Sequence, residues 1–249
     1  MNWSNWATIA DLATALGTLV LAVATFSAVR SANLTARIAQ ESLLVGLRPV
    51  LMPSRRDDPL QKVNFGDKHW VRIPGGGAVG EVGCGDGSMG SDPAIYLAVS
   101  LRNAGSGIAV LHGWRFYPGW HRDDTHAPLE EFVRQTRDLF IPVGDFGFWQ
   151  GAMRDVSDPQ YGPAREIIEN LKAWTVELLY GDHEGGQRAI TRFTMLRFGD
   201  MNPDADPHAD GAGDGDGDAD ADADTGSGAG SGWLVSQSRH WNIDRPDPR

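Results

Sequence analysis

The sequence predicts a mainly β protein, an antiparallel β-sandwich or partly open barrel, with an N-terminal transmembrane α-helix that a juxtamembrane helix extends. Three observations lead to this prediction. Residues 12–29 form one long apolar run, seven or eight short segments behind it alternate apolar with polar residues, and turn residues separate those segments. Short strands joined by turns are typical of sandwiches and barrels, and few long helical periods compete with that fold class.

The charge of the chain is concentrated in one segment. The formal net charge is −11, yet ten of the 33 acidic residues are aspartates between Asp200 and Asp224, so the other 23 nearly balance the 22 Lys and Arg residues. A near-neutral body lacks the clustered basic residues of a nucleic-acid-binding domain, so no nucleic-acid partner is expected. The single cysteine, Cys84, excludes an intrachain disulfide and any Cys-x-x-Cys motif.

The apolar run, Leu12–Val29, is expected to cross the membrane. Its eighteen residues extend about 27 Å as an α-helix, close to the thickness of the hydrocarbon core. The eleven residues before it carry no Lys or Arg, and the run is longer than the apolar region of a signal peptide, which favours an uncleaved anchor. Trp3 and Trp6 lie where aromatic residues commonly meet the membrane–water interface. The lipid bilayer is therefore the first expected partner.

The charges beside this run predict its direction. Arg30, Arg37 and Arg48 follow it, whereas residues 1–11 contain no basic residue. Positively charged flanks tend to stay in the cytoplasm. We therefore expect a single-pass protein of the plasma membrane, with the short N-terminus outside and the C-terminal domain in the cytoplasm.

Small residues recur along the same helix. Ala24, Ala28, Ala32 and Ala36 are four residues apart, an interval at which two membrane helices can approach closely. Two interpretations stand: a homo-oligomer formed through the helix, or the ordinary abundance of alanine in membrane helices.

A juxtamembrane helix is expected over 30–48, followed by a β-rich domain over 49–203. Gly46 and Pro49 end the helix, because proline cannot continue the hydrogen-bond ladder and restricts the residue before it. The clearest strand is 94–103, where apolar residues alternate with polar or small ones as in a half-buried strand. The other strands are expected over 50–52, 62–65, 68–73, 108–117, 140–143, 174–180 and 188–198.

The remaining segments are expected to form loops and short helices. Residues 74–93 contain eight glycines and are expected to form a loop, while 128–138 and 165–171 have the spacing of short helices. Residues 204–232 are almost entirely Asp, Ala, Gly and Ser, which cannot bury apolar area, so we expect a disordered acidic insert. Residues 233–249 then give a last strand and the C-terminal end.

One cluster of residue types suits a metal ion. His121, Asp123, Asp124 and His126 lie within six positions, and imidazole and carboxylate groups are common ligands of zinc and similar ions. A polar loop between two elements has the same composition, and a metal site needs three or four converging ligands. Both interpretations stand at this point.

Other candidates have simpler explanations. The residues Asp182, His183 and Glu184 are acid/base types, yet they lie at an expected hairpin turn, where polar residues are favoured. Cys84 has no histidine paired with it in the sequence, and its glycine-rich surroundings lack the ending of a phosphate-binding loop. No serine-hydrolase, zinc-protease or kinase signature occurs. We therefore predict no catalytic residue and no organic cofactor.

The pattern resembles a loose group of single-pass bacterial membrane proteins. The shared features are the anchor at 12–29, the pair Arg48-Pro49 at the entry to a β-domain, and a strand that ends in Asn-x-Gly-x-Gly-x-Ala, here Asn103 to Ala109. The resemblance implies a membrane anchor with a β-sandwich-like domain behind it. It implies no defined activity.

The expected function is binding. An anchor joined to a compact domain without a catalytic constellation suits an adaptor, a sensor or an accessory subunit, with a protein partner. The alternative is a metal-assisted hydrolase that uses the loop from His121 to His126. A third hypothesis is a small-ligand site in the mouth of the β-domain.

Overall fold

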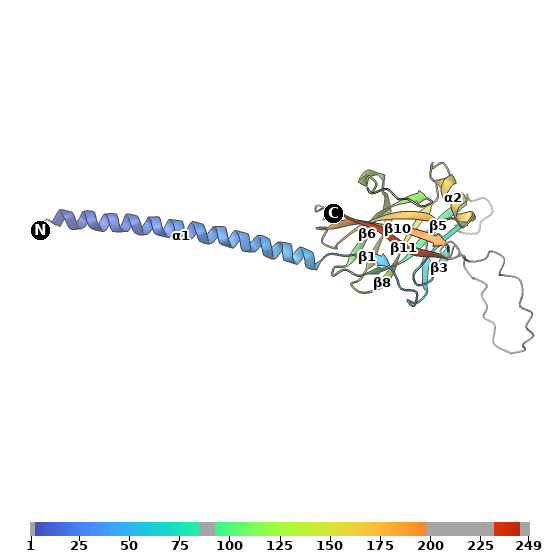
Figure 1. The fold of residues 1–249 in the computed structure, drawn as a ribbon, viewed down its shortest axis with the longest axis horizontal. Helices are drawn as coiled ribbons and strands as arrows, with labels where there is room; N and C mark the ends of the chain where they lie inside the picture. Colours follow the sequence, from blue (N-terminus) through green and yellow to red (C-terminus); the bar gives the residue numbers. More distant parts are fainter. Residues whose placement is uncertain (1–2, 85–92, 198–231, 245–249) are drawn as a thin grey trace, which may run out of the picture. The chain divides into compact units, whose positions relative to one another are not determined.

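The computed structural model describes residues 3–84, 93–197 and 232–244 (Figure 1). The chain divides into two units, Met1–Gly46 and Leu47–Arg249. The predicted acidic insert lies outside the described residues except for Gly232, and so do parts of the glycine-rich segment and of the C-terminal end.

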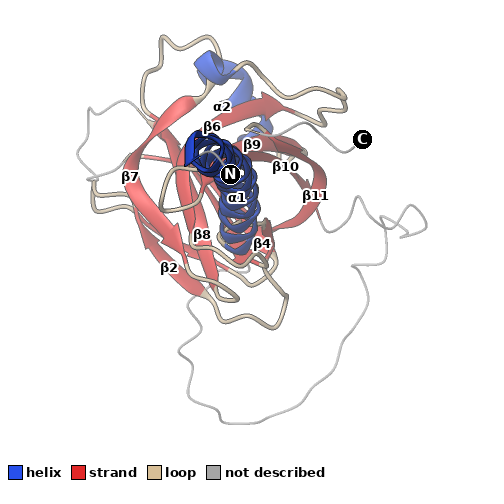
Figure 2. Cartoon of the chain, turned by 90° about the vertical axis from the view of Figure 1, so that its left-hand side faces the viewer, coloured by secondary structure: helices blue, strands red, loops and turns tan. Residues whose placement is uncertain are grey.

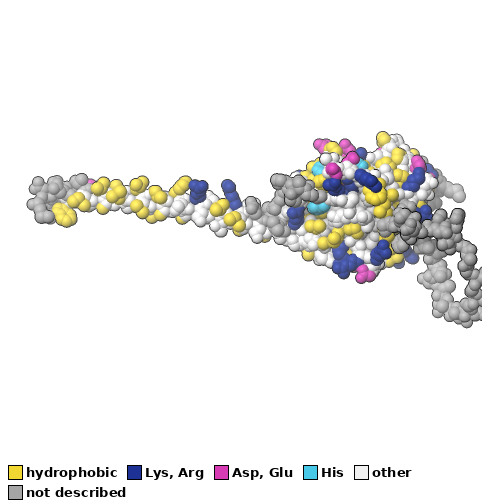
Figure 3. Space-filling model, viewed as in Figure 1, with side chains coloured by type: hydrophobic (Ala, Val, Ile, Leu, Met, Phe, Trp, Pro, Cys, Tyr) yellow, Lys and Arg dark blue, Asp and Glu magenta, His cyan; other side chains and the backbone are white. Residues whose placement is uncertain are grey.

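The first unit is a single α-helix, α1 (Trp3–Gly46), of 44 residues. The expected transmembrane and juxtamembrane helices are thus one continuous element, which confirms the long apolar N-terminal helix. Residues Ile9–Gln40 are long and apolar enough to cross a membrane, although a signal sequence near the N-terminus meets the same criteria. In Figure 3, apolar side chains follow the helix, and Arg30 and Arg37 are its described basic residues.

The second unit is mainly antiparallel β structure. Its nine-stranded sheet has the order β1-β5-β4-β11-β10-β9-β6-β7. The ninth strand, β8, lies off this path and pairs with β5. This sheet curls into a half-barrel (Figure 2). A sandwich is not confirmed, because the second sheet among the described residues holds only β2 (Gln61–Asn64) and β3 (Trp70–Ile73). The large sheet consists of β1 (Leu51–Pro53), β4 (Gly77–Gly83), β5 (Ala94–Asn103), β6 (Ala109–Pro118), β7 (Val133–Ile141), β8 (Phe146–Met153), β9 (Trp174–Gly181), β10 (Arg188–Arg197) and β11 (Trp233–Asn242).

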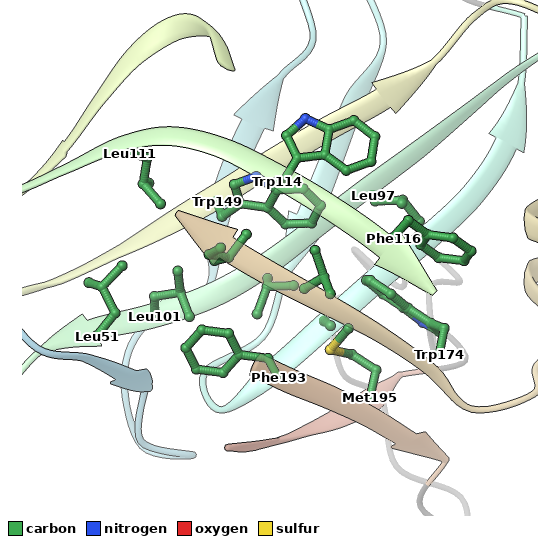
Figure 4. Packing of buried hydrophobic residues seen from close by; sticks show 14 of the residues in the cluster. Leu51, Leu97, Leu101, Leu111, Trp114, Phe116, Trp149, Trp174, Phe193 and Met195 are labelled. Carbon is green, nitrogen blue, oxygen red and sulfur yellow. The ribbon is translucent and has the colours of Figure 1, made fainter. Parts of the chain in front are cut away.

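The main core lies on the inner face of the curled sheet (Figure 4). Trp114 of β6 contacts Trp149 of β8 edge-on, with ring centroids 5.5 Å apart. Trp174 and Trp233 meet in the same way at 6.2 Å, and the indole N–H of Trp233 donates to the carbonyl of Lys172 at 3.0 Å. Large aromatic side chains from strands far apart in sequence therefore join the sheet into one core.

Strand β5 is confirmed with the predicted bounds, but its expected half-burial is wrong. Both of its faces are buried, and only Arg102 is partly exposed. The β2–β3 hairpin covers the outer face, where Val63, Phe65, Val71 and Ile73 pack with Tyr96 and Ala98. Alternation within one strand identifies its inner face, but it does not show which other element covers the outer one.

The predicted loop over 74–93 is wrong for Gly77–Gly83, which forms β4 between β5 and β11. Gly80 faces the helix α2 (Tyr161–Glu169), and a Cβ there would lie 2.5 Å from Cδ1 of Ile168. Glycine here permits the close approach of helix and sheet. The glycines that suggested a loop are thus part of a packed strand.

The predicted helix over 128–138 is also wrong. Only Leu129–Glu131 forms one short 3-10 turn, η1, and the chain then continues as β7. Strand β7 is at the edge of the sheet and mostly exposed, so its sequence lacks the alternation of a half-buried strand. The strand predicted at 140–143 is the end of β7. The helix predicted at 165–171 is confirmed over 165–169, as the second half of α2. The hairpin predicted from 174–180 and 188–198 is confirmed as β9 and β10, and Phe198 lies outside the described residues.

Candidate functional site

A buried ion pair lies on the outer face of the sheet. Arg192 of β10 and Glu177 of β9 are directly opposite each other in the ladder, and their side chains are 1% and 0% exposed. The guanidinium donates from Nε and Nη2 to Oε1 of Glu177, at 3.0 and 2.6 Å. A pair buried this fully needs further hydrogen bonds to offset its desolvation.

The loop of residues 119–128 supplies those bonds. Arg192 donates to the backbone carbonyls of Asp123 at 2.5 Å and Thr125 at 2.7 Å. The second oxygen of Glu177 accepts from the backbone N–H of Ala127 at 3.0 Å and from the Tyr117 hydroxyl at 3.0 Å. The ion pair therefore fixes the backbone of this loop on the sheet.

Aromatic rings surround the ion pair. The guanidinium of Arg192 lies 4.9 Å from the ring centroid of Trp241, and Tyr117 stacks on the ring of His121 at 3.9 Å. Burial lowers the pKa of His121, and the nearby charge of Arg192 lowers it further. Burial raises the pKa of Tyr117, with the Glu177 carboxylate adding to the effect. Both shifts favour the neutral form of the side chain.

The four predicted metal ligands lie on this loop, but their side chains have different partners. His121 Nε2 lies 3.5 Å from Asp123, Asp124 pairs with Arg239, and the ring of His126 meets that of Trp241 edge-on. Within residues 3–84, 93–197 and 232–244, no three His, Cys, Asp or Glu side chains form a group that could hold a metal. The metal hypothesis stays a prediction, which elemental analysis of the purified full chain tests.

An open groove of about 640 Å³ lies between β6 and β7. The register of the two strands breaks beside it: Leu111 pairs with Leu139 but Gly113 pairs with Arg134, which leaves residues 135–138 outside the ladder with β6. Leucine and phenylalanine side chains form one wall, and charged groups stand beside them. The groove residues used below are His112, Leu129, Phe132, Arg134, Leu179 and Arg188.

His112 is the titratable ring of this groove. Burial lowers its pKa, the charge of Arg188 lowers it further, and the carboxylate of Asp182 opposes the shift. Arg188 itself pairs with Asp244 at 2.8 Å. Arg134 forms no ion pair with a carboxylate in the described part of the chain, and Asp138 is a second charged residue of the lining.

The candidate acid/base residues of the hairpin turn have structural partners. Asp182 is buried, and its Oδ1 accepts from the backbone N–H of Gly186 at 2.8 Å, which closes the turn between β9 and β10. His183 and Glu184 pair with each other at 3.3 Å on the surface. Cys84 follows β4 and is exposed.

Sequence reasoning missed Arg192, Glu177 and His112. Alternation along β9 assigns Glu177 to the outer face, where a charged residue is expected to meet solvent. The available signal was the hairpin register, which places an Arg directly opposite a Glu. No sequence pattern indicated that the 119–128 loop covers Glu177 and Arg192.

Comparisons with models of protein families, with curated proteins and with solved structures find no match.

Proposed function

We propose that the chain is a single-pass membrane protein whose β-domain is a cytoplasmic binding module, with the β6–β7 groove as its ligand site. The exposure of α1 is the observation that supports a membrane anchor. None of the residues in its most apolar stretch of 18 is buried, although the β-domain buries a core of its own. A helix with apolar side chains all round needs a covering, and a bilayer provides it.

The polar groups of α1 support the same proposal. In a bilayer each polar group must find its partner within the protein. Every hydroxyl between Leu12 and Val29 donates to a backbone carbonyl three or four residues earlier, at 2.7 to 2.9 Å: Thr14, Thr18, Thr25 and Ser27. Trp6 is 64% exposed near the start of the helix, as an interfacial residue requires.

The orientation is tested with Cys84, the chain's only cysteine. A membrane-impermeant maleimide on intact cells is expected to leave it unlabelled and to label it after lysis. The matched control carries Cys84→Ser and Ser4→Cys, and we expect it to be labelled on intact cells. The reverse pattern overturns the orientation, and recovery of the chain in the soluble fraction after carbonate extraction overturns the anchor.

The β6–β7 groove supports the binding function. Its volume of about 640 Å³ is within the range of small-molecule sites, which combine apolar walls with a few polar groups. Leu129, Phe132 and Leu179 supply apolar lining, and two arginines, Arg134 and Arg188, stand against one carboxylate, that of Asp138. An organic anion with an apolar body fits this lining.

The probe for the groove is 1-naphthoate, measured by ligand-observed NMR with the full chain in nanodiscs and with empty nanodiscs as the blank. We expect binding that Leu179→Trp abolishes by filling the groove. The matched control is Val156→Trp, at an exposed apolar position elsewhere. Binding that Leu179→Trp leaves unchanged overturns the assignment of the groove, without affecting the anchor.

A further inference from the structure

A second, smaller cavity lies where the half-barrel is open. Strands β7 and β8 approach each other without a hydrogen-bonded ladder, and a cavity of about 90 Å³ lies between residues 133–137 and 150–152. Phe65 of the β2–β3 hairpin and Trp114 of β6 also line it. Because a buried water needs roughly 10–15 Å³ by this measure, the cavity has room for a small polyatomic ion.

Two glutamine side chains present unpaired oxygens here. Gln150 of β8 is only 7% exposed, and its Oε1 is buried without a hydrogen-bond partner. Gln135 of β7 donates its Nε2 to the carbonyl of Gln150 at 2.9 Å, which fixes its amide, and its Oε1 is also buried without a partner. Buried acceptors of this kind are costly, so they call for a donor in the cavity.

Three guanidinium groups line the same cavity. Arg154 pairs with Asp67 at 3.1 Å. Arg137 gives one N–H to the backbone carbonyl of Asn64 at 2.8 Å, and neither it nor Arg134 contacts a carboxylate among the described residues. Two arginines without a carboxylate partner thus line the same cavity as two glutamines with unpaired oxygens.

We propose that this cavity binds inorganic phosphate. The guanidinium groups suit an oxyanion, because bidentate Arg–phosphate contacts are among the strongest charge-assisted hydrogen bonds. The amide oxygens require an O–H donor on the same ion. Protonated inorganic phosphate carries both, whereas sulfate at neutral pH and the fully ionised monoester of a lipid headgroup have no O–H. The inference is independent of the membrane anchor. The cavity shares Arg134 and Gln135 with the lining of the β6–β7 groove, but its tests use Arg137 and Gln150, which do not line that groove.

Isothermal titration of the full chain in detergent, in a phosphate-free buffer, compares phosphate with sulfate at equal ionic strength. We expect saturable phosphate binding at one site per chain, and sulfate binding at least tenfold weaker. Equal affinity for the two anions, or no phosphate binding, overturns the proposal. If phosphate does not bind, ordered water is the hydrogen-bond donor to the two glutamine oxygens.

Three variants place the site. Arg137→Gln removes an exposed charge and is expected to weaken phosphate binding at least tenfold, while Gln150→Glu places a carboxylate in the cavity and is expected to abolish it. Arg72→Gln, an exposed position on β3 outside the cavity, is the matched control and is expected to bind as the wild type does. If Gln150→Glu does not fold, Arg137→Gln alone decides. Unchanged phosphate affinity in Arg137→Gln overturns the site.

Discussion

The outer face of the half-barrel is covered in two different ways. Over β5, the β2–β3 hairpin contributes Val63, Val71 and Ile73 to a small apolar cluster, which we call the apolar cover. Over β9 and β10, the 119–128 loop is fixed by the Arg192–Glu177 pair, and we call it the polar cover. Both exclude water from the sheet, but by different physics.

The difference lies in what each cover specifies. Apolar burial is non-directional and contributes about 25 cal/mol per Å² removed from water, so it holds the hairpin without fixing each atom. A buried ion pair gains little net stability, because desolvation offsets the attraction, but it tolerates only one arrangement of its partners. The polar cover therefore sets the position of a loop that has few apolar residues of its own.

The largest expected effect comes from breaking the ion pair on one side. Arg192→Met leaves the Glu177 carboxylate buried without its cation, and we expect a loss of about 3–5 kcal/mol in the free energy of unfolding. Denaturation of the full chain in detergent, followed by tryptophan fluorescence, measures it. The double variant Arg192→Met, Glu177→Leu removes both charges and is expected to lose less than Arg192→Met does. A double variant that loses more than the single one contradicts this account of the polar cover.

A substitution in the apolar cover is expected to cost less free energy of unfolding than the loss of Arg192. Ile73→Ala removes a fully buried side chain from β3, and a loss of about 2–4 kcal/mol is expected, because the hairpin can partly close the cavity. Arg72→Gln, exposed on the same strand, should change stability by less than about 0.5 kcal/mol. An Ile73→Ala loss no larger than that of Arg72→Gln would show that the hairpin does not form this part of the core.

The two covers also mark how far sequence reasoning reaches. The long helix and the β2–β3 and β9–β10 hairpins could be predicted, because local periodicity and turn chemistry specify them. Strand β4 and the edge strand β7 could not, because the pairing that makes them strands comes from distant residues. Glu177 shows where sequence reasoning stops. Alternation assigns it correctly to the outer face, but its carboxylate accepts a hydrogen bond from the backbone N–H of Ala127, fifty positions earlier.

A smaller effect is expected on the polar cover as the pH falls below 6.5. The folded pKa of His121 lies below its ordinary value of 6.5, because burial and the charge of Arg192 disfavour the imidazolium. The unfolded chain then binds more protons than the folded one, so this contribution to stability is complete above pH 6.5 and is lost as the pH falls from there through the folded pKa. His121→Gln should reduce the pH dependence of unfolding in that window, where the lowered pKa of His112 acts in the same direction. If the variant leaves the pH dependence of the free energy of unfolding unchanged, His121 does not contribute to it.

The smallest effect is expected at the outer edge of the polar cover, where Asp124 pairs with Arg239 of β11. The Asp124 side chain is 81% exposed, so water and salt screen the pair, and exposed pairs contribute at most about 1 kcal/mol. Asp124→Asn keeps the shape of the side chain and is expected to cost less than about 0.5 kcal/mol. Hydrogen exchange at Ala127, whose N–H bonds Glu177, distinguishes the two attachments. If Asp124→Asn opens that amide as fully as Arg192→Met does, the surface pair holds the loop and the buried one does not.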